Sequence, residues 1–166
     1  MLRILLAVIV SLCAFASPSL ADTRARAVLQ EGRSALVTND DDSRGSGRSA
    51  EVLRIAERYI GTNPTSMRRL WCANFLGMVE KKAGRSGSGS NFARSYASYG
   101  KSVSRSSVKP GDIAVMARGK RGGHVGYFVG WAPNGKAIII SGNSRGGKVS
   151  KGQYAANRIF AWRRPA

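Results

Sequence analysis

The stretch Leu70-Trp71-Cys72-Ala73-Asn74-Phe75 places a cysteine where a helix is expected to begin. We expect this helix to run from about Trp71 to Lys82 and to stop at Gly84. Cys72 then lies in its first turn, where free backbone N–H groups and the positive end of the helix dipole favour a thiolate and can stabilise an oxyanion. The alternative is a buried cysteine that packs as a small apolar residue.

The one histidine of the chain lies in Gly122-Gly123-His124-Val125-Gly126-Tyr127-Phe128, and an asparagine follows in Ser141-Gly142-Asn143-Ser144. A cysteine hydrolase uses a thiol, an imidazole and a polar orienting group, and this chain presents them in that order. We expect His124 at the start of one strand and Asn143 just past the end of its hairpin partner. These ends are adjacent in an antiparallel hairpin, so the pattern predicts a triad of Cys72, His124 and Asn143.

The regions around these motifs predict helices first and strands afterwards. Ser49 can cap a helix that Gly61 ends, and its apolar face comprises Val52, Ile55, Ala56, Tyr59 and Ile60. A short third helix is expected over 91–99. The turn signals at 109–112 and 132–135 separate apolar runs that we expect to be strands, over 113–116, 124–131, 137–140 and 158–162. This order is typical of an α+β fold.

Residues 1–21 have the features of a secretory signal peptide that is cleaved after Ala21. Its apolar run is too short for a membrane span, and a lipid anchor on Cys13 needs a small residue where Leu12 stands. We therefore expect a periplasmic or secreted protein without a stable membrane anchor. Cleavage leaves Cys72 without a disulfide partner in a compartment where disulfides normally form.

Composition divides the remaining chain into two parts. We expect residues 22–48 to be an N-terminal extension and flexible linker, because residues 38–49 are polar and rich in Gly and Ser. Residues 49–166 suit a single domain, which we expect to be a monomer. One cysteine and one histidine are too few for a usual metal site, so we expect no metal and no cofactor.

The formal net charge of +18 indicates an anionic partner. Export excludes nucleic acid and leaves cell-wall peptides, acidic envelope polymers and lipid head groups. Cations also flank the three motifs, at Arg68, Arg69, Arg118, Lys120, Arg121, Arg145 and Lys148. If the motifs converge, these cations surround one cleft, favour a substrate with carboxylates and help to stabilise a thiolate. The alternative is a solvated basic surface that keeps the protein soluble.

Together, residues 71–75, Lys109-Pro110-Gly111-Asp112-Ile113, Gly123-His124-Val125-Gly126 and Ser141-Gly142-Asn143 resemble the secreted cysteine peptidases and amidases of the NlpC and CHAP type. The resemblance covers residues 49–166. It implies a small papain-like α+β fold, with N-terminal helices packed on an antiparallel sheet. It also implies action on peptidoglycan.

The resemblance implies a role for each residue of the triad. Cys72 is the nucleophile, and His124 deprotonates the thiol and later protonates the leaving amine. Asn143 holds the imidazole, and Tyr59 is a candidate to assist the oxyanion. We expect substrate contacts from Arg69, Arg121, Arg145 and Trp71, the last with the alternative of a core anchor.

The resulting hypothesis is a cysteine hydrolase that cleaves an amide bond in the peptide part of peptidoglycan. One alternative is a module of the same fold that binds stem peptides or another anionic cell-wall polymer without cutting it. A second alternative is an acyltransferase that passes the same thioester to an amine.

Overall fold

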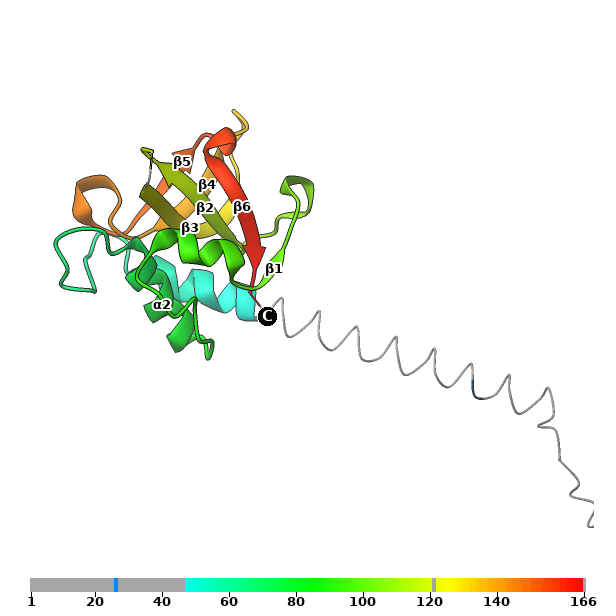
Figure 1. Cartoon of the computed structure of the whole chain (residues 1–166), viewed down its shortest axis with the longest axis horizontal. Coiled ribbons are helices and arrows are strands. Elements are labelled where there is room, and N and C mark those ends of the chain that lie inside the picture. Colours follow the sequence, from blue (N-terminus) through cyan, green and yellow to red (C-terminus); the bar gives the residue numbers. More distant parts are fainter. Residues whose placement is uncertain (1–25, 27–46, 121, 166) are drawn as a thin grey trace, which may run out of the picture. The chain divides into compact units, whose positions relative to one another are not determined.

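The computed structural model describes Arg26 and residues 47–120 and 122–165 (Figure 1). The signal peptide, and the extension except for Arg26 and residues 47–48, lie outside these described residues. Both therefore stay predictions. No helix in the described ranges is long and apolar enough to cross a membrane.

A six-stranded antiparallel sheet forms the centre of the described region, in the order β1-β6-β2-β3-β4-β5 (Figure 1). Its strands are β1 (Lys101–Ser102), β2 (Ile113–Arg118), β3 (Gly122–Trp131), β4 (Ala137–Ser141), β5 (Ser150–Tyr154) and β6 (Ile159–Arg164). β2, β3, β4 and β6 agree with the predicted strands, whereas β1 and β5 were not expected. β3 lies between β2 and β4. His124 is paired with Met116 of β2, whereas the pairing of β3 with β4 begins only at Tyr127.

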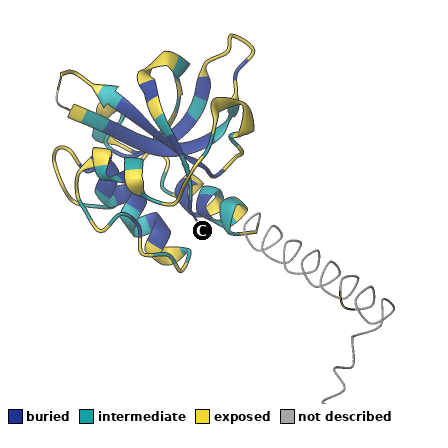
Figure 2. Ribbon diagram, turned by 45° about the vertical axis from the view of Figure 1, so that its right-hand side comes forward, coloured by how far each residue is buried: buried dark blue, intermediate teal, exposed yellow. Residues whose placement is uncertain are grey.

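The helices lie on one side of this sheet (Figures 1 and 2). Residues 47–57 are helical, and α2 spans Cys72–Lys82. Single 3-10 turns complete the described elements: η1 (Ala93–Ser98), η2 (Arg105–Ser107), η3 (Arg145–Gly147) and η4 (Ala156–Arg158). The prediction for α2 is confirmed at both ends, with Trp71 as the N-cap and Gly84 in the left-handed region at φ 76°.

Three details of the helix predictions are wrong. The first helix ends at residue 57, so Gly61 follows a turn and does not end the helix. The first helix is already formed at Gly47, so Ser49 lies inside it and does not cap it. Ser49 instead packs on the turn before β2, where a Cβ on Gly111 would lie 2.7 Å from the Ser49 Cβ. This tertiary contact overrides the local capping signal. The expected third helix is the 3-10 helix η1, which occupies only Ala93–Ser98.

Both faces of the sheet are buried (Figure 2). On the helix side, the first helix contributes Val52, Ile55 and Ala56 of its predicted face, and the core also includes Trp71, Phe75, Leu76, Val79, Val125, Tyr127 and Ile140. Tyr59 and Ile60 follow the end of this helix, and Ile60 is 43 % exposed. A smaller cluster on the other face includes Ala114, Met116, Phe128, Ile139, Ile159 and Trp162. This apolar burial is the main stabilisation of the fold and holds α2 against β3.

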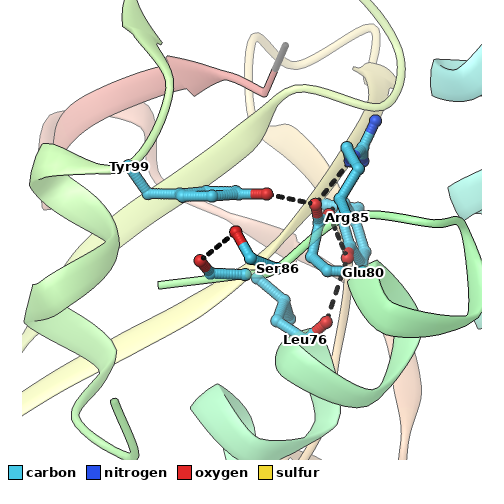
Figure 3. A network of polar contacts seen from close by, with 7 residues as sticks. Leu76, Glu80, Arg85, Ser86 and Tyr99 are labelled. Carbon is cyan, nitrogen blue, oxygen red and sulfur yellow. Dashed lines mark hydrogen bonds and ion pairs between the residues drawn. The ribbon is translucent and has the colours of Figure 1, made fainter. Parts of the chain in front are cut away.

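A buried carboxylate also ties α2 to the sheet (Figure 3). Glu80 in α2 is fully buried and accepts two hydrogen bonds from Arg85, at 2.6 and 2.8 Å. Tyr99, just after η1, and Tyr127 in β3 donate to the same carboxylate at 2.8 and 2.7 Å. A buried charge is tolerated when it is paired and hydrogen-bonded in this way. Glu80 thus fixes α2 relative to β3.

Candidate active site

Cys72 is the first residue of α2 and is only 4 % exposed. The first turn of α2 carries no acidic residue and no side-chain cap, so the positive end of the helix is not neutralised. The prediction that Cys72 lies in the first turn is confirmed. Burial nevertheless raises the pKa of the thiol above its ordinary value of 9.0, although backbone groups of Val125 and Ala73 and the Arg118 cation lower it. Cys72 is therefore a thiol at neutral pH in the free protein.

The chain enters α2 through a strained residue. Leu70 has a φ of 57° in the left-handed region and is 71 % exposed. A bulky side chain is uncommon in this region, and such strain often accompanies functional positions. The turn at Leu70 directs Trp71 into the core, where it is completely buried. Cys72 follows directly.

His124 in β3 is 2 % exposed, and its two ring nitrogens have different surroundings. A hydrogen bond of 3.0 Å joins Nε2 to the Ser141 hydroxyl, and the Tyr154 hydroxyl lies 3.5 Å from the same nitrogen. Nδ1 has no hydrogen-bond partner among the described residues. One nitrogen is thus held by a hydrogen bond, and the other has no partner among the described residues.

Burial, together with the Arg118 and Arg158 cations, lowers the pKa of His124 from 6.5 to about 4. The imidazole is therefore neutral at neutral pH and can accept a proton. Arg118 affects both groups, because its charge lowers the pKa of His124 and of the Cys72 thiol. The structure thus places the start of α2 and the start of β3 within the field of one cation.

Two glycines allow the close approach of the elements that carry these groups. A Cβ on Gly142 would lie 2.5 Å from Cζ3 of Trp71 and 2.6 Å from Cβ of Phe75. A Cβ on Gly126 would lie 2.8 Å from Cβ of Ser141. Contacts under 3.0 Å are not tolerated, so both positions need glycine. The end of β4 is thereby brought against α2 on one side and β3 on the other.

Ser141, rather than Asn143, contacts the imidazole. Asn143 has a φ of 48° in the left-handed region, which Asn tolerates. Within the described residues it makes no hydrogen bond to His124. The orienting role of Asn143 therefore stays a prediction. Sequence reasoning missed Ser141, although its place in the same short motif, at the end of an apolar strand, was a usable signal.

Tyr154 was also missed. Its hydroxyl lies 3.2 Å from the Ser141 hydroxyl and 3.0 Å from the Ser144 hydroxyl, and its ring is 5.8 Å from the His124 ring. Tyr154 ends β5, whose sequence Ser-Lys-Gly-Gln-Tyr has no apolar alternation that would have predicted a strand. The hydroxyl groups of Ser141, Tyr154 and Ser144 thus form a connected series that begins at Nε2.

The other predicted site residues differ in how far they are exposed to solvent. Trp71 has no exposed surface to offer a ligand, so the structure favours a core anchor over a substrate contact. Tyr59 is half-buried, with its ring edge-on to Phe75 at 6.2 Å, and its assisting role stays a prediction. Arg69 and Arg145 are exposed, and Arg121 lies outside the described residues. Among the described residues, no group of three side chains could hold a metal ion.

A comparison with known protein families found a match. Residues 63–143, from the segment before α2 to Asn143, match the CHAP domain. A search of curated proteins found no match. CHAP domains are papain-like amidases and peptidases that act on cell walls, and helices packed on an antiparallel sheet are consistent with their fold. The predicted resemblance is therefore confirmed, and this chain carries a CHAP domain.

Proposed function

We propose that this protein is a cysteine amidase or peptidase that cleaves an amide bond in the peptide part of peptidoglycan. The CHAP domain suggests a peptidoglycan hydrolase. The observation that carries the proposal is the different bonding of the two ring nitrogens of His124. Nε2 is hydrogen-bonded to Ser141, whereas the buried Nδ1 has no partner among the described residues. A buried polar atom is normally hydrogen-bonded, and an unpartnered imidazole nitrogen is available to accept a proton.

The mechanism begins with a neutral pair. The mechanism uses the tautomer in which Nε2–H of His124 donates to the Ser141 hydroxyl 3.0 Å away and the lone pair is on Nδ1. As the Cys72 sulfur attacks the amide carbonyl, Nδ1 takes the thiol proton. Because the thiol pKa is raised and the imidazole pKa is lowered, this transfer accompanies attack instead of preceding it.

The N-terminus of α2 supports the negative charge that develops on the substrate oxygen. The first backbone N–H groups of a helix have no partner within it, and here no side chain caps them. The N–H of Cys72 is the nearest of these donors along the chain, and the positive end of the dipole adds to its effect.

Three proton transfers complete the cycle. The imidazolium returns its proton through Nδ1 to the leaving nitrogen, the C–N bond breaks, and a thioester to Cys72 and a free amine result. Water then attacks the thioester while His124 accepts its proton. The imidazolium returns this proton to the departing Cys72 sulfur, which releases a carboxylic acid and regenerates the thiol. An amine in place of water would make the protein an acyltransferase.

Release of new amino groups from purified peptidoglycan tests the proposal. We expect release by the native protein and none by Cys72→Ala. Lys101→Gln, in β1 at the far edge of the sheet from β5, is the matched control and should leave the rate unchanged. If Cys72→Ala retains activity, the assignment of the nucleophile is wrong. If neither protein releases amines but both sediment with the wall, the domain is a binding module.

A further inference from the structure

A groove of about 750 Å³ follows β5, the outermost strand of the sheet. We propose that it binds a carboxylate-bearing peptide segment in an extended conformation. This inference rests on the proposed function and names the part of the substrate that is recognised. The polar side chains that line the groove include Lys136, Ser144, Arg145, Lys151, Gln153 and Tyr154.

The charge of the groove selects an anion. Its lining has three cations and no acidic side chain. Lys136 and Arg145 form no ion pair with any described residue, and Lys151 has only a loose, exposed contact of 3.8 Å with Glu57. These cations therefore keep their charges available for a ligand, and electrostatic complementarity of this kind steers a partner into place.

The groove leads to the candidate catalytic histidine. Tyr154 lines the groove, and its hydroxyl lies 3.5 Å from Nε2 of His124 and 3.2 Å from Ser141. Ser144, which also lines the groove, lies 3.0 Å from the same hydroxyl. A ligand in the groove thus contacts the side chains that hold the imidazole.

The exposed edge of β5 favours a peptide over a phosphate polymer. β4 pairs with one side of β5, and no strand in the described ranges pairs with the other. Just before β5, the backbone of Val149 is paired: its C=O accepts from the N–H of Gly61 at 2.9 Å, and its N–H donates to the C=O of Thr62 at 2.8 Å. Beyond it, backbone N–H and C=O groups can pair with an extended peptide, while lysine and arginine bind its carboxylates.

Binding to purified peptidoglycan, measured by sedimentation in a Cys72→Ala background, tests this inference without turnover. We compare Lys136→Gln/Arg145→Gln with a charge-matched control, Lys101→Gln/Lys109→Gln, whose positions are exposed and outside the groove. The groove variant should bind about tenfold more weakly, as expected for the loss of two exposed charge contacts. The control should change affinity less than about twofold because its charges act only at long range. Equal losses in both variants would contradict a specific groove.

Competition distinguishes the ligand classes. An oligoglutamate peptide should displace the protein from the wall at lower concentration than polyphosphate with the same number of charges. The reverse order overturns the assignment to a peptide. If the groove variant loses binding as expected but the protein with an intact Cys72 releases no amines, the hydrolase proposal fails while the groove remains a binding site.

Discussion

Nε2 of His124 lies 3.0 Å from the hydroxyl of Ser141, so a neutral hydroxyl holds the imidazole. A carboxylate at this place would stabilise the imidazolium, whereas a hydroxyl gives little charge compensation. Together with burial and the Arg118 and Arg158 cations, this explains why the pKa of His124 falls to about 4. The site is therefore arranged for a neutral base.

Ser141→Ala should lower kcat about tenfold, since it removes one neutral hydrogen bond that orients the base. The matched variant is Asn143→Gly, which keeps the left-handed backbone and removes the side chain. Asn143→Gly should lower kcat less than Ser141→Ala does. Steady-state rates on a soluble peptidoglycan peptide measure both. A larger loss for Asn143→Gly would restore the triad predicted from the sequence.

The reactivity of the Cys72 thiol should rise only at alkaline pH. Burial raises its pKa above 9.0, so the rate of alkylation by iodoacetamide should increase through and above pH 9. Because the Arg118 cation lowers this pKa, Arg118→Gln should shift the profile to higher pH. Fast alkylation that is constant from pH 6 to 8 would show a preformed thiolate–imidazolium pair and contradict the neutral pair.

The stability of the domain should depend on pH through His124. Between pH 6.5 and 4 the unfolded chain binds a proton on this histidine that the folded protein excludes, so stability falls as pH falls through this range. The lowered pKa corresponds to about 3 kcal/mol in the free energy of unfolding. Urea unfolding at pH 7 and pH 4 measures it. Because the chain has one histidine, the difference in unfolding free energy between pH 7 and pH 4 should be clearly smaller in His124→Gln. An unchanged difference would show that His124 is not its cause.

Glu80→Gln should destabilise the domain by about 3 to 5 kcal/mol, because it leaves the buried cation of Arg85 without its partner. The Arg85 side chain is only 7 % exposed. Glu51→Gln is the matched control, since Glu51 pairs with an arginine on the exposed surface of a helix. It should have no measurable effect. Urea unfolding at pH 7 measures the free energy of unfolding of both variants. Comparable losses would show that the buried Glu80 network stabilises the domain no more than an exposed ion pair does.

Much of the fold could be predicted because its signals are local. The bounds of α2 follow from the residues at its ends, and the turn before β2 follows from residues 109–112. β5 could not be predicted in this way. It is a polar edge strand whose pairing with β4 is decided by the hairpin around it. The cap at Ser49 failed because packing against Gly111 outweighs a local preference.

The sequence was sufficient to find the motifs of the candidate site, but not to show which residue of the third motif contacts His124. Cys72 and His124 stand out because each is nearly unique in the chain. The choice between Ser141 and Asn143 depends on backbone direction, which the left-handed turn at Asn143 and the close packing of Gly142 determine. Such features arise from tertiary contacts, and residue types alone do not reveal them.

Digestion of purified peptidoglycan in ¹⁸O-labelled water, followed by mass spectrometry of the fragments, tests the central claim most directly. Hydrolysis through a Cys72 thioester predicts fragments with one ¹⁸O in each new carboxyl group, and none from Cys72→Ala. Fragments released equally by Cys72→Ala, or no fragments from the native protein, would contradict the account.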